Sequence, residues 1–145
     1  MSQLYLFARV ADTQIAVASG EVEAVVKLGD VSPVPGMPAH IAGLSALRSR
    51  VLTIIDIAAL IGGAPTPAAG RALAIIADIA GHSYGLMVDA VTDICPVPDG
   101  ELPLRGQLDP AWAPHARALV EGEHGLSLLV SLAGFIDPVQ PALAA

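Results

Sequence analysis

The chain has 145 residues, of which 54% are hydrophobic and only 14% are charged, and this length allows one domain with a large core. The net charge of −7 and the 3% aromatic content argue against nucleic-acid binding, which needs a cationic surface and stacking rings. The longest uncharged run, 31–47, contains three prolines and therefore predicts no membrane-spanning helix. No cationic stretch precedes an apolar one near the start, so we expect no signal peptide, and the single Cys95 fits a reducing cytoplasm.

The first elements of the chain are predicted to be short strands. Leu4, Leu6 and Val10 lie at alternate positions, as expected for a strand with one buried face. A turn at 11–14 separates this strand from a second one that begins at Ile15. The many prolines and glycines along the chain also favour short strands joined by turns.

A single helical turn is predicted after the second strand. Ser19 is placed to cap this turn, and Val22 and Val25 then lie on one face because they are three residues apart. These two valines, together with Val91 in the second half, are either core residues or a stripe that binds a partner. The spacing alone favours the core.

The segment 43–62, GLSALRSRVLTIIDIAALIG, is expected to organise the rest of the chain. The prolines before it predict an extended path over the surface, without pairing in a central strand. Within it, residues 51–55 are β-branched or aliphatic and predict a strand buried on both faces. Asp56 then begins a short helical segment that Gly62 can end.

Two arginines, Arg48 and Arg50, lie at a predicted tight turn in this segment. A guanidinium held beside apolar runs could pair with a carboxylate of a partner in a partly dry interface. Considered alone, Arg48 is more simply a solvated turn residue. Both interpretations of Arg48 stay open at this point.

The second half of the chain repeats the pattern of the first. Residues 73–76 align with 4–7, and the alignment continues without a gap to place Val91 over Val22 and Ile94 over Val25. At a larger offset, Ala118 and Leu119 align with Gly43 and Leu44. The additional residues fall in the proline-rich stretch 99–114. We therefore expect a mainly β protein whose two halves, each of five short strands, share one hydrophobic core.

Catalytic and metal sites find little support in the sequence. Asp56 and Asp89 both end apolar runs, and a small acid hydrolase would need two such carboxylates close together. The repeat aligns Asp56 with Ser131 and Asp89 with Gly20, so the two aspartates are not repeat mates and are better explained as strand-end or cap residues. The four histidines lack the spacing of metal ligands, and no basic residue near Cys95 activates its thiol. We expect no enzyme activity, cofactor or metal.

Three stretches give the chain a resemblance to a known family. The run VSPVPGMPAHIAGLSALRSRVLTIIDIAALIG, the run YGLMVDAVTDI and the closing LVEGEHGLSLLVSLAGFI resemble, in this order, segments of CheW-like chemotaxis coupling proteins. The resemblance covers residues 4–137. It implies a single domain of 145 residues made of two SH3-like five-stranded β-barrels around a shared core, with short helices and subdomains near 1–66 and 71–140.

The resemblance also implies a function and a set of contact residues. Members of the family are adaptors without catalytic activity that join the regulatory domain of a CheA-type histidine kinase to the cytoplasmic tips of chemoreceptors in membrane-associated arrays. Carried over by position, the receptor-binding residues are Val22, Val25, Arg48, Leu73 and Val91. The kinase-binding residues implied in the same way are Gly43, Leu44 and Ile94.

The chain departs from the family pattern at three positions. Ser49 replaces the usual glycine after Leu-Arg, Ala46 replaces a common asparagine, and Ala118 replaces a glycine of the last motif. A serine would be strained if that corner requires a positive φ. These departures leave open a divergent coupler that binds only the kinase or serves a chemosensory pathway unrelated to motility.

Overall fold

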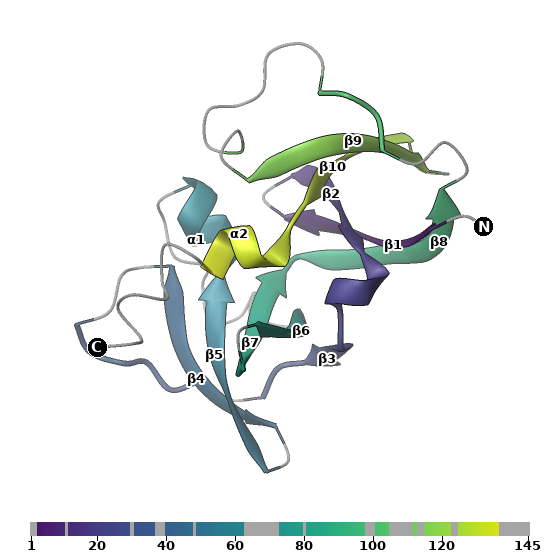
Figure 1. Ribbon diagram of the computed structural model, residues 1–145. Helices are drawn as coiled ribbons and strands as arrows, with labels where there is room; N and C mark the ends of the chain where they lie inside the picture. The colour runs from purple at the N-terminus through teal and green to yellow at the C-terminus, as the bar shows by residue number, and fades with distance from the viewer. Residues whose placement is uncertain are drawn as a thin grey trace.

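The computed structural model describes residues 3–10, 12–29, 31–36, 40–47, 49–62, 73–79, 81–97, 101–104, 112, 115–122 and 125–136. Within these residues, ten strands form two five-stranded sheets, and only three short helical segments are present (Figure 1). The helical segments are η1 (Ser19–Glu21), α1 (Ile57–Gly62) and α2 (Leu132–Ile136). The expected mainly β architecture of two five-stranded units is confirmed.

The two sheets have the same internal order. Sheet A runs β8 (Ala90–Val97), β1 (Gln3–Val10), β2 (Thr13–Ala18), β10 (Gly125–Val130) and β9 (Ala116–Gly122). Sheet B runs β3 (Ala24–Lys27), β6 (Leu73–Ile79), β7 (His82–Val88), β5 (Arg50–Asp56) and β4 (Ile41–Leu47). In each sheet one pair is parallel, β2 with β10 and β5 with β7, and the other pairs are antiparallel.

The sequence repeat coincides with these elements. The alignment places β1 to β5 over β6 to β10 in order, and α1 over α2. Replacing each strand of sheet A by its repeat counterpart gives the order of sheet B. The two barrels are therefore built to one plan, in agreement with the repeat.

The sheets do not follow the boundaries 1–66 and 71–140. Sheet A takes β1 and β2 from the first half of the chain and β8 to β10 from the second, whereas sheet B takes β6 and β7 from the second half and β3 to β5 from the first. The chain crosses between the sheets at η1, which lies between β2 and β3. The division at 66 and 71 thus describes the repeat, and each barrel contains strands from both halves.

A core shared by both sheets explains the aliphatic strands. Alternate residues of one strand face different layers: Leu6 and Ala8 of β1 belong to the shared core, while Tyr5 and Phe7 belong to a second cluster inside sheet A. A third cluster, which includes Ile54, is formed by residues of sheet B. The shared core also contains residues of both helices and Trp112. Strands with apolar layers on both faces need continuous apolar runs, and the sequence has them.

Two local predictions need correction. The strand from Val51 was expected to be buried on both faces, but Val51 is 64% exposed, Thr53 is half-buried, and continuous burial begins at Ile54. Among the described residues, no other layer covers Val51 on the outer face of the β4–β5 hairpin. Ser19 was expected to cap a helical turn; a single 3-10 turn forms there, but it begins without a side-chain cap. Among the described residues, no helix is long and apolar enough to cross a bilayer.

Two histidines occupy repeat-equivalent positions ahead of β4 and β9. His40 and His115 each have a buried ring nitrogen without a hydrogen-bond partner among the described residues, Nε2 in His40 and Nδ1 in His115. The His115 ring stacks on Phe135 of α2, with ring centroids 4.7 Å apart. Burial lowers the pKa of both imidazoles, although a hydrogen bond with the Gly134 backbone acts in the opposite direction at His115.

The first prediction concerns the mixing of the two halves. We expect fragments 1–66 and 71–145 to be unfolded when they are purified separately, because each contains only part of each sheet and isolated hairpins are marginally stable. Mixing the two fragments should restore the β-sheet signal in circular dichroism and one cooperative melting transition. A cooperative transition of fragment 1–66 alone would contradict this interpretation.

The second prediction concerns pH. Because the folded pKa values of His40 and His115 lie below the ordinary value of 6.5, the stability from keeping them neutral is complete above pH 6.5 and is lost as the pH falls through the folded values. The free energy of unfolding in urea should therefore be lower at pH 5.5 than at pH 7.5. His115→Gln should reduce this difference, because glutamine does not titrate in this range. An unchanged difference in His115→Gln would refute this role for His115.

Candidate protein-interaction surfaces

The residues carried over as receptor contacts lie mainly at the junction between the sheets. Val22 follows η1 and is half-buried against the shared core, as are Leu73 on β6 and Val91 on β8. Val25 lies on β3, an edge strand of sheet B, and is exposed. Val22, Leu73 and Val91 therefore serve the core as well as any surface that they line.

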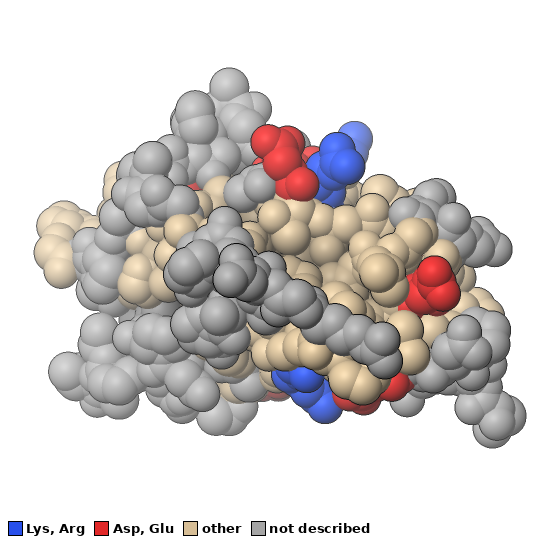
Figure 2. All heavy atoms as spheres, turned by 90° about the horizontal axis from the view of Figure 1, so that it is seen from above, with Lys and Arg blue, Asp and Glu red and all other residues tan. Residues whose placement is uncertain are grey.

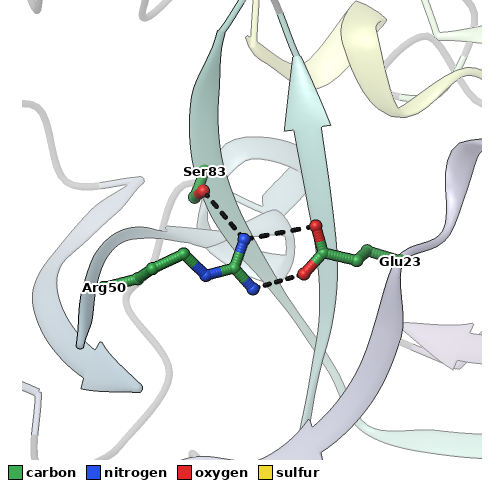
Figure 3. Close-up of polar contacts among 3 residues, drawn as sticks. All are labelled: Glu23, Arg50 and Ser83. Carbon is green, nitrogen blue, oxygen red and sulfur yellow. Dashed lines mark hydrogen bonds and ion pairs between the residues drawn. The ribbon is translucent and has the colours of Figure 1, made fainter. Parts of the chain in front are cut away.

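Arg48, the remaining candidate receptor contact, lies outside the described residues. Its neighbour Arg50, at the start of β5, forms an ion pair with Glu23, which immediately precedes β3 (Figure 3). The Arg50 Nη1 atom also donates to Ser83 Oγ of β7 at 3.4 Å. The hydrogen bond from Arg50 lowers the pKa of the Glu23 carboxyl. The pair links β5 to the start of β3, but both side chains are exposed and solvent screens their attraction.

The structure gives a backbone reason for glycine at Gly43, a candidate kinase contact. Gly43 has a φ of +143° on β4, and a Cβ atom there would lie 2.1 Å from the carbonyl oxygen of Ser32. The close approach accompanies an isolated bridge in which Leu44 and Ser32 exchange two hydrogen bonds of 2.8 and 2.9 Å. Gly43 is buried, so it shapes the edge of β4, and Leu44, which is exposed, presents a side chain there.

Ile94, the third candidate kinase contact, is 55% exposed on β8, the edge strand of sheet A next to β1. It is the repeat counterpart of Val25 on β3, which is also exposed. The two residues were assigned to different partners, the receptor for Val25 and the kinase for Ile94. The fold places them at equivalent positions of the two sheets.

Sequence analysis missed two surfaces on the outer sides of the β4–β5 and β9–β10 hairpins. The first hairpin face consists of Leu44, Ala46 and Val51, and Ala46 pairs with Val51 in the register. The second hairpin face consists of the repeat counterparts Leu119, Glu121 and Leu126, and Glu121 pairs with Leu126. The repeat already aligned Val51 with Leu126, so the sequence related the two faces to each other. The apolar run at 51–55, however, indicated that Val51 is buried.

The second hairpin face forms part of a half-open groove of about 360 Å³. Leu102, Pro103, Leu119 and Leu126 line it, with Glu121 as its one carboxylate among the described lining residues. Leu102 and Leu119 exchange backbone hydrogen bonds of 2.7 and 2.9 Å, as Ser32 and Leu44 do beside the first face. In the view from above, charged side chains are sparse over the described surface (Figure 2). Uncharged surface of this kind is typical of protein contacts.

The two aspartates considered for acid catalysis have different surroundings. Asp56 is buried at the end of β5, and its Oδ1 accepts the N–H of Ala59 at 3.1 Å, which caps α1 as expected. Asp89 lies exposed at the bend between β7 and β8. This capping role is a sufficient reason for an aspartate at position 56, and no catalytic role is needed to explain it.

The conformation of Gly43 generates the third prediction. Gly43→Ala should destabilise the protein by about 1–3 kcal/mol, because a left-handed conformation is costly for alanine and the new methyl group meets the Ser32 carbonyl. Chemical denaturation measures this loss. Gly29→Ala is the matched control, since a Cβ at Gly29 meets nothing within 4 Å, and equal effects of the two substitutions would contradict the explanation.

Comparison with known proteins gives one consistent result. Residues 4–139 match the CheW-like domain family. The chain is 35% identical over 91 residues to a probable chemotaxis protein CheW of Rhizobium etli, and 33% identical over 94 residues to the chemotaxis protein CheW of Rhizobium meliloti. These alignments cover 63% and 65% of this chain, and 59% and 61% of the relatives' own lengths.

A solved structure supports the same fold. The crystal structure of the scaffolding protein TtCheW from Thermoanaerobacter tengcongensis matches with a TM-score of 0.77, covering 91% of this chain and 86% of that one. Their sequences are 20% identical, so this likeness concerns the fold. With a family match that spans nearly all of its length, the chain belongs to the family of CheW-like domains.

Proposed function

We propose that the chain is a non-catalytic chemotaxis adaptor that joins the regulatory domain of a CheA-type histidine kinase to the cytoplasmic tips of chemoreceptors. One observation carries the proposal. The first hairpin face and the apolar residues at the junction between the sheets are two separate surfaces beside one shared core. A protein with separate apolar surfaces on a common core is suited to hold two partners at once.

The kinase domain is assigned to the first hairpin face. This face contains Leu44, a family-implied kinase contact, and extends it to the more exposed Val51. Ile94 adds apolar surface on the edge of sheet A. The face carries no charged side chain at its three positions, so its contribution to binding is burial of apolar area.

The receptor tip is assigned to the junction between the sheets. Apolar side chains come from β3, β6, β8 and the end of η1, namely Val22, Val25, Leu73 and Val91. Arg48, which lies between β4 and β5 in the sequence, would add a cation. A cytoplasmic location with recruitment to membrane-associated receptor arrays belongs to this proposal. Binding to nucleic acid or insertion into the membrane does not.

A second candidate function is a divergent regulator that binds only the kinase or serves a pathway unrelated to motility. It is favoured by Ala46, which replaces the family's common asparagine and lies exposed on the first hairpin face. Ser49, also exposed, follows Arg48 at the hairpin turn and replaces the usual glycine. Both departures lie where the assigned partners would bind.

The fourth prediction separates the two partners. Val51→Glu should weaken binding of a purified CheA-type regulatory domain at least about tenfold, because a buried unpaired charge is costly. Arg48→Glu should weaken binding of a purified receptor-tip fragment and leave the melting temperature nearly unchanged. Isothermal titration calorimetry with each partner measures these effects.

The control for these variants is Leu4→Glu, at an exposed leucine of β1 outside both hairpin faces, which should bind both partners normally. Kinase binding without any receptor binding by the wild-type chain would favour the kinase-only regulator. Kinase binding that is unaffected by Val51→Glu would contradict the assignment of the first hairpin face. Unfolding of the Arg48→Glu variant would indicate that Arg48 has a structural role and is not a receptor contact.

A further inference from the structure

The two helices aligned by the repeat begin in different ways. Asp56 caps α1 from within its own half of the chain, by accepting the N–H of Ala59. Its counterpart ahead of α2 is Ser131, whose hydroxyl does not turn to the helix. Instead, the N–H of Gly134 donates to the Ser131 carbonyl at 3.0 Å, and the Ser131 hydroxyl donates to Glu21 at 3.2 Å. The second half therefore lacks the capping carboxylate that the first half has.

Glu21 supplies that carboxylate from the other half of the chain. Its Oε1 accepts the N–H of Leu132, the first residue of α2, at 3.0 Å as well as the Ser131 hydroxyl. A carboxylate beside the free N–H groups that begin a helix is favourable. The contact has no repeat mate, since the residue that aligns with Glu21 in the second half is Ala90.

The topology explains why these distant residues meet. Strands β2 and β10 are parallel neighbours, so they end at the same edge of sheet A. The segment η1, which contains Glu21, follows β2, and α2 follows β10. The contact thus ties the point where the chain leaves sheet A for sheet B to a helix whose Leu132 and Phe135 are completely buried in the shared core.

The residues after Glu21 are bound to sheet B, because Ala24–Lys27 pair with β6 and Glu23 forms an ion pair with Arg50 of β5. The N–H of Val22 donates to Ser19 within η1, and the N–H of Glu23 donates to Ile76 of β6 at 2.8 Å. The Glu21 carboxylate, in contrast, bonds to Ser131 and Leu132, which follow β10 of sheet A. This carboxylate therefore adds a polar contact between the start of α2, which follows sheet A, and the segment that carries Val22 and leads to β3.

We propose that Glu21 is a positioning residue, which caps α2 in place of the missing aspartate and thereby fixes Val22 and β3 at the junction between the two sheets. This inference rests on the proposed function only in its consequence, namely that Glu21 contributes to receptor-tip binding without forming part of the contact surface. The structural portion concerns this chain alone.

The test exchanges the cap between the two halves. Glu21→Ala should increase amide hydrogen exchange of α2 and of Ala24–Lys27 about fivefold, an effect on the scale of a lost helix cap. Ser131→Asp alone should also destabilise the protein, because a second carboxylate would face Glu21. In the double variant, the aspartate introduced at position 131 caps α2 in the manner of Asp56, so the melting temperature and the exchange of α2 should recover.

The decisive readout is β3 in the double variant Glu21→Ala/Ser131→Asp. If Glu21 positions the junction, Ala24–Lys27 should continue to exchange about fivefold faster than in the wild type, because the new cap does not reach η1. If hydrogen exchange returned to the wild-type rate in both α2 and β3, the proposal would be overturned, because Glu21 would then act only as a helix cap. Unchanged exchange in Glu21→Ala would also overturn it.

Two further variants exclude trivial explanations. Glu21→Gln keeps an acceptor oxygen, so it should fold in any case and show a smaller increase of exchange than Glu21→Ala. Glu23→Ala removes a neighbouring carboxylate that pairs with Arg50, and it should leave the exchange of α2 unchanged. Increased α2 exchange in Glu23→Ala would show that charge alone is responsible, which contradicts the proposal.

A receptor-tip fragment provides the functional readout. Its affinity should fall in Glu21→Ala and remain low in the double variant despite the recovered melting temperature. If the wild type does not bind the fragment, the proposed function fails, while hydrogen exchange still decides whether Glu21 positions β3. Restored affinity in the double variant would overturn the positioning role.

Discussion

Burial of aliphatic strands between two barrels is the dominant stabilising interaction in this protein, and its other features follow from it. The central strands β1, β2, β6 and β7 send alternate side chains into the shared core and into the interior of their own sheet. Each barrel is too small to bury enough apolar surface on its own, and the shared layer supplies the remainder. This requirement accounts for the high hydrophobic content and for the low number of charges.

The exchange of strands between halves links the two barrels through shared strand pairing. Every sheet contains strands from both sides of the repeat, so neither barrel can open without disrupting the pairing of the other half. A fixed relation between two surfaces is what the proposed adaptor function requires, because one partner is then oriented relative to another. The hairpin faces lie on β4 with β5 and on β9 with β10, the last two strands in the order of each sheet, where Leu44, Val51 and Leu126 remain exposed.

Polar side chains are used sparingly and at the connections between elements. Asp56 caps α1, Glu21 reaches α2 from the opposite half, and Arg50 pairs with Glu23 across β7. The two aligned helices differ in the source of their cap, which breaks the internal symmetry at the point where the chain crosses between sheets. The two hairpin faces differ in a similar way, since Glu121 stands where the first face has Ala46. A repeat-built protein can thereby present two related but distinguishable surfaces.

Local patterns along the chain were enough to predict the repeat, the first two strands, the strand before Asp56 and the helix that Asp56 begins, because alternation, turn residues and cap residues act over a few neighbouring positions. The same patterns carried the family resemblance. Which sheet each strand joins became known only from the three-dimensional arrangement, since the pairing of β3 with β6 and of β8 with β1 depends on the shared core. The exposure of Val51 and the need for glycine at Gly43 also required the folded structure, because both depend on whether a distant segment packs against that position.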